Sequence, residues 1–495
     1  MEEAFYPVLE NWPLLFLLGI AGVYILQRVQ YRQTYKDYLN LPWVGDGSTT
    51  DLRFAMEQGT RKYPDRPFIL PLQDPTVILP HSVIEEVKSL PASQASIERN
   101  NYRRFFGQYT LMGIPSDEFV SSIKQDLTRH VGILLPELFE EARFATDCAM
   151  GGDKTCHLLP VYPAMLRYIA LLSGRTFVGL PLSRSEDWIQ SSIQYAVESV
   201  EAGHQLRAYP TTLRRLVAPF LAKIRRVQQH QKKVRHMLRN ILAKSQELEK
   251  STDSRDPDQG RLALWLRRHY RQRHSTITES DLGKDHLLAS FAAIHIATNA
   301  LTQILLDLAA RPEYQEPLRN EAAQVLDLTG ESKITMAELS KLVRLDSFMK
   351  ESLRASPPGG VVTMMRELTA PIALSCGPIL PKGTLIAFAN NRFDMSSHQP
   401  SDPDDFDGFR FVKEDGGSRQ QLITTSHDSL TWGYGSHACP GRQFAATELK
   451  VIIIHLLTNF DLRMKDGAPR PANSSHDFQI MPDPHAVIEF CKRNN

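Results

Sequence analysis

The most constraining feature of the sequence is a glycine-rich loop that carries one cysteine. Residues 432–442 read WGYGSHACPGR, with three glycines and a proline among them. Glycine allows backbone conformations and close approaches that a side chain blocks, so this composition predicts a tight, preformed loop. The following residues 443–460 are apolar around most of the helical circumference, which predicts a buried helix. The fold must therefore hold Cys439 just ahead of a buried helix, with room for something flat or bulky against the loop.

The position of Cys439 allows two interpretations. Free amide donors and the dipole at a helix N-terminus are expected to lower the pKa of the thiol and to favour the thiolate, which is the form that a soft metal ligand takes. The alternative is a buried core cysteine in a glycine-rich turn. The loop alone leaves both open.

Charge and composition exclude several classes of protein. The 495 residues are 42% hydrophobic and 23% charged, which provides a substantial core and excludes a disordered chain. The 57 Lys and Arg residues against 56 Asp and Glu residues give a net charge of +1, so a dedicated nucleic-acid binder is not expected. Two basic stretches, residues 223–250 and 261–274, have few interleaved aromatics and are predicted to be amphipathic helices with solvated basic faces.

The cysteines favour a reducing environment. Five cysteines are too few and too scattered for a disulfide framework, and none has the CxxC spacing of a structural zinc site. The body of the chain is therefore expected to face the cytosol.

An apolar segment near the N-terminus predicts a membrane anchor. Residues 12–26 carry no charge and would span about 22 Å as a helix; an extension back to residue 5 would supply the rest of a hydrocarbon core of about 30 Å. Acidic residues precede the segment and basic residues follow it, which favours a cytosolic body. A cleaved signal peptide is the alternative, but a basic n-region is missing. We expect a transmembrane anchor at 1–27, a linker at 28–46 and one domain at 47–495.

The body of the chain is predicted to be mainly α-helical with a small β-sheet portion. Residues 85–360 show mostly helical periodicity, and strand-like segments are confined to about 67–80 and 360–390. No internal repeat of solenoid length is present.

The cysteine loop resembles the FxxGxRxCxG loop of the cytochrome P-450 haem-thiolate monooxygenases. Gly435, Cys439 and Gly441 fall on the family positions, Trp432 replaces the aromatic Phe, and His437 replaces the Arg that contacts a haem propionate. Histidine can still donate a hydrogen bond there. The resemblance implies haem b as the cofactor, Cys439 as the axial ligand of its iron, and the cytochrome P-450 fold with an N-terminal anchor helix.

A second family element is an ExxR helix, in which i, i+3 spacing puts a carboxylate and a guanidinium on one face. Glu351 and Arg354 match it. The same spacing recurs at Glu316 and Arg319, where ordinary surface ion pairing is expected. Only Glu351 and Arg354 precede a strand-like segment, then FDGFRF and then the cysteine loop, in the order that the family has.

The resemblance also implies roles for two further arginines. Arg410, in FDGFRF, matches an arginine that joins the ExxR pair in a buried structural charge cluster. Arg366 matches a position that often contacts a haem propionate, with a solvated arginine at a strand edge as the alternative.

The helix that crosses above the haem in this family is matched by residues 286–310. Ala292 and Ala293 would leave room for oxygen and substrate. The family pattern AGxDT or AGxET supplies an acid and a threonine that help to deliver protons; here His295 stands at the acid position and Ile296 at the threonine position. His295 could relay protons, or it could be a hydrogen-bonded core histidine, in which case water, a substrate hydroxyl or a shifted helix would replace the relay.

The resemblance implies a membrane-anchored fungal monooxygenase, similar to the ent-kaurene-oxidase-like group. It would oxidise an apolar terpenoid, meroterpenoid or indole-diterpene intermediate of secondary metabolism. Its implied partners are NADPH-cytochrome P-450 reductase, a lipid membrane and, as a further candidate, cytochrome b5; its implied location is the endoplasmic reticulum, single-pass, with the domain in the cytosol. Substrate contacts are expected from residues 102–116, from Ala292–His295 and from the strand after Pro358.

Two alternatives keep the cofactor and change the function. Without a relay hydroxyl at Ile296, the enzyme could catalyse a rearrangement, a dehydration or a peroxide-fed step. The protein could also be a haem-binding sensor or carrier without turnover.

Overall fold

The computed structural model describes residues 40–45, 50–72, 74–113, 115–151, 155–248, 261–273, 278–329, 334–395, 404–418 and 420–493, with Gly19, Gly22, Ile25 and Asp402 as isolated positions. Apart from the isolated positions Gly19, Gly22 and Ile25, the expected anchor at 1–27 lies outside the described residues, as does most of the linker at 28–46.

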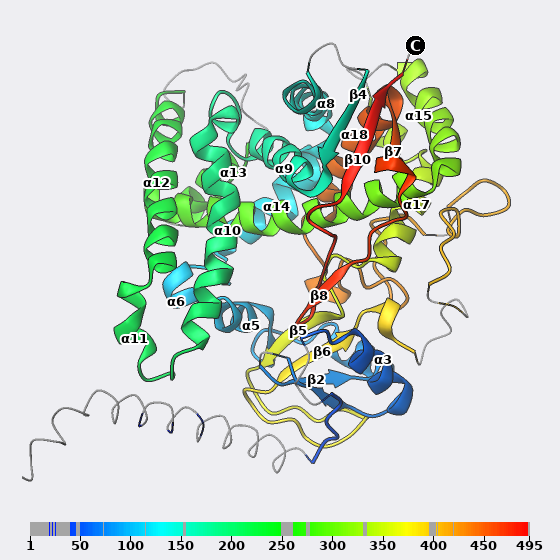
Figure 1. Cartoon of the computed structure of the whole chain (residues 1–495). Coiled ribbons are helices and arrows are strands. Elements are labelled where there is room, and N and C mark those ends of the chain that lie inside the picture. The colour runs from blue at the N-terminus through cyan, green and yellow to red at the C-terminus, as the bar shows by residue number, and fades with distance from the viewer. Residues whose placement is uncertain are drawn as a thin grey trace, which may run out of the picture.

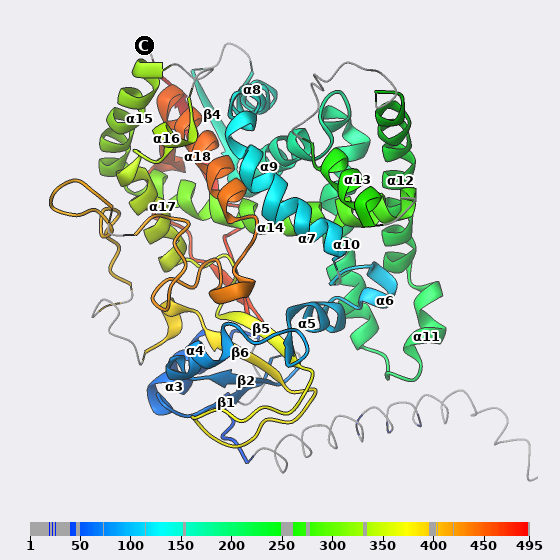
Figure 2. The same cartoon turned by 180° about the vertical axis from the view of Figure 1, so that it is seen from behind.

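Helices make up most of the described chain. They are α3 (Arg53–Lys62), α4 (Ile84–Val87), α5 (Ile97–Arg104), α6 (Gly107–Thr110), α7 (Asp117–Ser121), α8 (Thr128–Met150), α9 (Val161–Val178), α10 (Glu186–Arg207), α11 (Arg214–Val217), α12 (Ala222–Leu248), α13 (Leu262–Arg273), α14 (Glu279–Ala310), α15 (Gln315–Thr329), α16 (Met336–Leu339), α17 (Val343–Ala355) and α18 (Arg442–Asn459). Helix α14 runs through the centre, with α10, α11 and α12 on one side and α15, α17 and α18 on the other (Figures 1 and 2).

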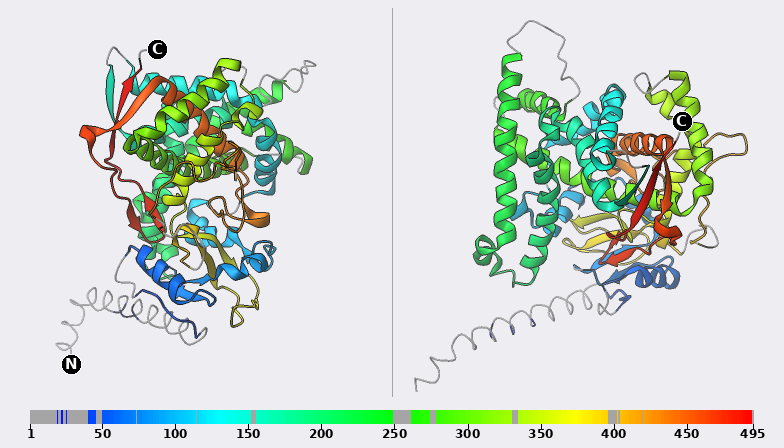
Figure 3. Two further views of the ribbon diagram at one scale, coloured as in Figure 1. Left: turned by 90° about the vertical axis from the view of Figure 1, so that its right-hand side faces the viewer. Right: turned by 45° about the horizontal axis from the view of Figure 1, so that its top comes forward.

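Strands form three small sheets. They are β1 (Phe68–Leu70), β2 (Thr76–Leu79), β3 (Ala95–Ser96), β4 (Cys156–Pro160), β5 (Val362–Leu368), β6 (Leu385–Ala389), β7 (Phe460–Met464), β8 (Ser474–His476), β9 (Gln479–Met481) and β10 (Val487–Lys492). The sheet orders are β1-β2-β6-β5-β3, β4-β10-β7 and β8-β9. The largest sheet and the β4-β10-β7 sheet lie at opposite ends of the molecule (Figures 1 and 3).

The predicted mainly helical fold with a small β-sheet portion is confirmed. Strands β1 and β2 fall within the expected segment 67–80, and β5 and β6 fall within 360–390. Strand β4 and the four C-terminal strands were not predicted, because they are short and because the partners of β4 and β7 lie on the distant β10.

Helix α14 is the centre of the hydrophobic core. It starts earlier than the expected residue 286, because Thr278 and Asp281 form a capping box at its N-terminus. Among the described residues, α14 is the helix that could cross a membrane by length and composition, but 72% of its most apolar window is buried inside the protein. It packs against α9, α10, α12 and α17, so burial accounts for its apolar surface.

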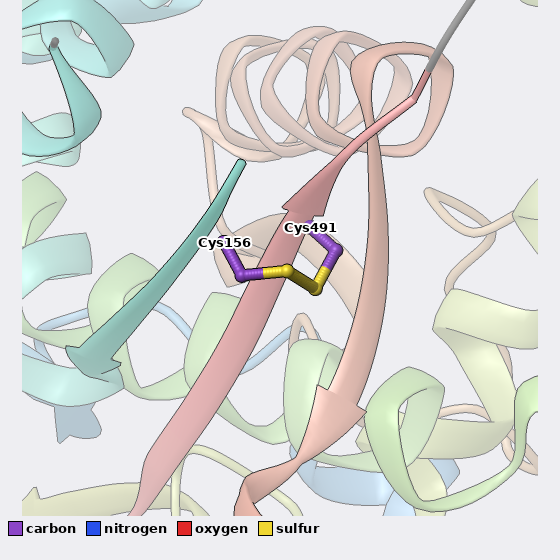
Figure 4. Close-up of a disulfide and its surroundings, with 2 residues drawn as sticks. All are labelled: Cys156 and Cys491. Atoms are coloured by element: carbon purple, nitrogen blue, oxygen red, sulfur yellow. A yellow bond between two sulfur atoms is a disulfide. The ribbon is translucent and has the colours of Figure 1, made fainter. Parts of the chain in front are cut away.

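One pair of cysteines forms a disulfide that the sequence did not predict. Cys156 on β4 stands directly opposite Cys491 on β10, and their sulfur atoms are bonded at 2.08 Å (Figure 4). The antiparallel register brings the two Cα atoms within 4.0 Å, although 335 residues separate them in the sequence. Cys148, Cys376 and Cys439 are free thiols.

A buried carboxyl group predicts a pH dependence of stability. Glu448 on α18 is buried and accepts a hydrogen bond of 2.8 Å from the Ser173 hydroxyl on α9. Burial raises the pKa of Glu448 from 4.5 to about 8. The folded state therefore keeps a proton that the unfolded chain releases, so this contribution to stability is present below about pH 4.5 and is lost as the pH rises to about 8.

We expect Glu448→Gln to flatten this part of the pH profile. Glutamine keeps an acceptor for Ser173 and has no proton to lose, so the variant should gain about 3 kcal/mol over the unsubstituted protein at pH 8 relative to pH 5. Urea unfolding at a series of pH values measures this. The exposed Glu316→Gln serves as the control, and equal pH slopes for Glu448→Gln and the unsubstituted protein would contradict the prediction.

Candidate functional site

The cysteine loop is a tight turn that only glycine permits at one position. Gly435 has φ of 80°, and a Cβ there would lie 2.5 Å from the carbonyl oxygen of Lys88. The Cys439 amide donates to the Trp432 carbonyl at 2.7 Å, and the Trp432 indole N–H donates to the Leu422 carbonyl at 2.8 Å. These bonds fix the loop before any ligand is bound.

The pKa of the Cys439 thiol depends more strongly on burial than the sequence predicts. It lies three residues before α18. Burial raises the pKa of Cys439, against the lowering effect of the Gly441 and Arg442 amides and of the Arg442 charge. The expected lowered pKa is therefore wrong for the protein alone, because desolvation outweighs the helix terminus. A thiol that coordinates a metal is deprotonated by the charge of the metal.

Two residues matched to haem propionates meet on one stretch of backbone. Arg366 on β5 donates to the carbonyls of Val87 at 2.7 Å and Lys88 at 3.2 Å. His437, in the cysteine loop, lies with Nε2 at 3.2 Å from the Leu90 carbonyl. Both side chains thus contact the backbone of residues 87–90, although 71 positions separate them in the sequence.

Arg366 is a buried cation in need of an anion. The residue is 1% exposed, and its Nε has no hydrogen-bond partner among the described residues. Burial lowers the pKa of its guanidinium. The charge of Glu98 opposes this effect, and an anionic group from outside the chain fits beside the unpartnered Nε.

One face of α14 is apolar and open. Ala292 and Ile296, one helical turn apart, are exposed, whereas Ala297 and Thr298 beside them are buried. Ile296 is 51% exposed. Ala293 is half-buried and packs on the core. The middle of the central helix therefore presents an apolar stripe that can lie against a flat apolar group.

The side chain of His295 contacts helix α10. Its Nε2 lies 3.1 Å from the carbonyl oxygen of Ile193 on α10, which makes this nitrogen the donor. Burial lowers the pKa of His295. The contact favours the hydrogen-bonded core histidine, and a proton relay through His295 stays a prediction.

Glu351, Arg354 and Arg410 form one charge cluster. Glu351 is fully buried and accepts from Arg354 Nε and Nη2 at 2.8 and 2.9 Å and from Arg410 Nε at 3.2 Å. The Asp407 amide adds a bond of 3.1 Å to the same carboxylate, and both arginines donate to the Asp405 carbonyl at 2.9 Å. The cluster joins α17 to the segment that leads to the cysteine loop.

The second pair with ExxR spacing, Glu316 and Arg319, is not the ordinary surface ion pair that the sequence predicts. Glu316 is exposed, but Arg319 is 8% exposed and also donates to the carbonyls of Leu457 and Phe460. This arginine therefore anchors the end of α18 as well as pairing with Glu316, which i, i+3 spacing alone does not reveal.

Comparison with known proteins decides the family. The family model described as Cytochrome P-450 matches residues 100–489. The chain belongs to this family. The cytochrome P-450 monooxygenase ascG of Acremonium egyptiacum is 38% identical over 97% of this chain and 95% of its own length. The monooxygenase gliF of Aspergillus fumigatus is 34% identical over the whole of both chains. The monooxygenase ataF of Aspergillus terreus is 35% identical over 96% of this chain and 94% of its own length.

The protein is thus a fungal cytochrome P-450 monooxygenase of secondary metabolism, and its cofactor is haem b. The residues described above fit that group: a cysteine thiol in a preformed loop, a buried guanidinium with a free nitrogen, and an open apolar helix face. Cytochrome P-450 monooxygenases also require a reductase and bind small-molecule substrates.

The structure brings together residues of α5, α10, β5 and the β8–β9 hairpin that the sequence did not single out. Arg104 on α5 lies in the expected segment 102–116, and its Nη1 donates to the Met365 sulfur on β5 at 2.8 Å. Phe478, in the β8–β9 hairpin, stacks under Arg104, with 3.5 Å between the guanidinium carbon and the ring centroid. Arg207 on α10 donates to the Arg104 carbonyl at 2.7 Å. Only the tertiary fold brings these four segments together.

Proposed function

We propose that Cys439 is the thiolate ligand of the haem iron and that the enzyme oxidises an apolar terpenoid, meroterpenoid or indole-diterpene intermediate. The observation that carries the proposal is the placement of Cys439 in a preformed glycine loop ahead of α18, braced on the same backbone stretch as the buried cation Arg366. Haem b, when bound, supplies the oxidant that transfers one oxygen atom of dioxygen to a carbon.

The residues of this chain would have separate tasks around that group. Arg366 would pair with a propionate through its free Nε, and His437 would hydrogen-bond near the same edge. Ala292 and Ile296 would form an apolar wall that excludes water and leaves space for the substrate. The Glu351–Arg354–Arg410 cluster would hold the backbone that leads to the cysteine loop.

The cellular setting follows from the sequence and the family. The proposed anchor at 1–27 and linker at 28–46 would tether the domain at 47–495 to the endoplasmic reticulum on the cytosolic side. Electrons would come from NADPH-cytochrome P-450 reductase, with cytochrome b5 as a further candidate donor. The near-neutral net charge of +1 supports a small-molecule enzyme without a nucleic-acid partner.

Ile296 favours a second candidate reaction. Its side chain cannot hydrogen-bond, and the neighbouring His295 is turned to the Ile193 carbonyl. Protons would then have to come from water or from a substrate hydroxyl. A dehydration or rearrangement without oxygen insertion is the alternative under these conditions. A sensor without turnover is not supported, because the relatives are monooxygenases.

Labelled dioxygen separates the two reactions. The holoenzyme is incubated with a fungal reductase, NADPH and a panel of terpenoid, meroterpenoid and indole-diterpene scaffolds under isotopically labelled dioxygen. We expect one product that carries one labelled oxygen atom by mass spectrometry. A product formed without label, in the same incubation, would contradict oxygen insertion and establish the alternative.

A further inference from the structure

The apolar stripe that Ala292 and Ile296 form on α14 ends at a buried asparagine. Asn299 follows Ile296 by three residues, so it lies on a neighbouring part of the same helix face, about 4.5 Å further along the axis. Ile296 is exposed, whereas Asn299 is 2% exposed. A buried amide needs hydrogen-bond partners, because leaving it unpaired is costly. The partners of Asn299 therefore show what covers this end of the stripe.

The β8–β9 hairpin covers the end of the stripe (Figure 1). Asn299 Nδ2 donates to the carbonyl oxygen of Ile480 on β9 at 2.8 Å and lies 3.6 Å from the Met481 sulfur. The hairpin forms a two-stranded sheet of its own, and a two-stranded hairpin is marginally stable by itself. Its position therefore depends on contacts with neighbouring elements, and Asn299 supplies one from the central helix.

A chain of polar side chains orients the amide of Asn299. Gln303, one turn further along α14, donates from Nε2 to Asn299 Oδ1 at 3.4 Å. Arg470 Nη2 donates to Gln303 Oε1 at 2.6 Å, and Arg470 Nε donates to the buried Asp307 carboxylate at 2.6 Å. Because Oδ1 of Asn299 accepts from Gln303, its Nδ2 is the atom that meets the hairpin. The donor to Ile480 is thus held in place by a buried ion pair two side chains away.

A second attachment connects the hairpin to β5. The amide of Val361, directly before β5, donates to the carbonyl oxygen of Phe478 at 2.8 Å. Gly360 has φ of 89°, and a Cβ there would overlap the same carbonyl oxygen. The hairpin is therefore held between α14, which carries the apolar stripe, and β5, which carries Arg366.

We propose that Asn299 is a positioning residue for ligand selection: it holds the β8–β9 hairpin at the end of the stripe, where the hairpin forms a wall for the larger part of a ligand. This inference rests on the proposed function, because it places the haem and the substrate over Ala292 and Ile296. A wall that is fixed before binding costs the ligand less free energy than one that is ordered on binding. Asn299 therefore acts on the affinity for large ligands and not on coordination of the iron.

Two iron-binding probes of different size test the proposal on the holoenzyme. Imidazole and 1-dodecylimidazole share the nitrogen that binds iron and differ in a long apolar chain. Each is titrated while the shift of the Soret band is recorded. We expect Asn299→Ala to weaken binding of 1-dodecylimidazole at least about tenfold, because the chain loses a fixed wall, and to change imidazole affinity less than about twofold. A general loss of structure would weaken both probes alike.

The matched control is Ser474→Ala, which removes an exposed hydroxyl that bonds within the same hairpin, to the Met481 carbonyl at 3.4 Å. It should leave the affinity for both probes unchanged. Gly360→Ala displaces the hairpin from the side of β5 and should reproduce the selective loss while Asn299 stays in place.

Hydrogen exchange supplies a readout that needs no ligand. In Asn299→Ala, the backbone amides of residues 474–481 should exchange at least about tenfold faster, whereas those of β7 should not change. Unchanged exchange in the hairpin, or equal effects on the two probes in either Asn299→Ala or Gly360→Ala, would overturn the proposal. A missing Soret shift with imidazole in the unsubstituted holoenzyme would instead contradict the proposed haem site, so the two failures are distinct.

Discussion

Replacing Glu351 with glutamine is expected to prevent the chain from accumulating as folded, haem-loaded protein. Glu351 is fully buried and takes hydrogen bonds from Arg354, Arg410 and the Asp407 amide. Loss of its charge breaks the ion pair with Arg354, which is 9% exposed. Breaking such a buried pair costs about 3–5 kcal/mol, against a total stability of about 5–15 kcal/mol. Soluble yield and urea unfolding measure the effect.

A matched control separates burial from spacing. Glu316→Gln removes the carboxylate of another i, i+3 pair, but this carboxylate is exposed and Arg319 keeps its bonds to backbone carbonyls. It should cost less than about 1 kcal/mol. If Glu351→Gln were as stable as Glu316→Gln, the cluster would not have the structural role assigned to it.

Replacing Cys439 with alanine is expected to abolish oxygenation while leaving the fold intact. The thiol is the soft donor in the loop, and donation from a thiolate is what favours cleavage of the oxygen–oxygen bond. The loop itself is fixed by bonds that do not involve the sulfur, such as Cys439 N–H to Trp432. We expect the NADPH-dependent turnover to fall at least about a thousandfold, equivalent to about 4 kcal/mol of barrier.

The control for this prediction is another free thiol. Cys148 on α8 is exposed, and Cys148→Ala should retain the turnover of the unsubstituted protein. Turnover of Cys439→Ala within about tenfold of the Cys148→Ala variant would show that Cys439 is not the ligand.

Local patterns predicted the parts of the site that depend on short segments. The composition of 432–442 predicted a tight turn, and Gly435 occupies a position where a Cβ would meet Lys88. The order of Glu351, Arg354 and Arg410 along the chain predicted three residues that the structure joins in one cluster. In each case the information lies in neighbouring residues or in a family pattern.

The parts that could not be predicted depend on distant contacts. Cys156 and Cys491 pair because β4 and β10 align in one register, which spacing of 335 residues does not encode. The thiol pKa of Cys439 rises because burial outweighs the nearby amides, and burial is a property of the whole fold. Arg104 and Arg207 come from separate helices, and neither has a local motif that marks it.

The central claim is that Cys439 binds the haem iron as a thiolate. Its most direct test is the difference spectrum of the reduced holoenzyme after addition of carbon monoxide, recorded for the unsubstituted protein and for Cys439→Ala. We expect the strongly red-shifted Soret band of a thiolate-ligated ferrous carbonyl complex in the first and its loss in the second. Folded, haem-loaded protein without this band, or the same band in Cys439→Ala, would contradict the assignment of Cys439.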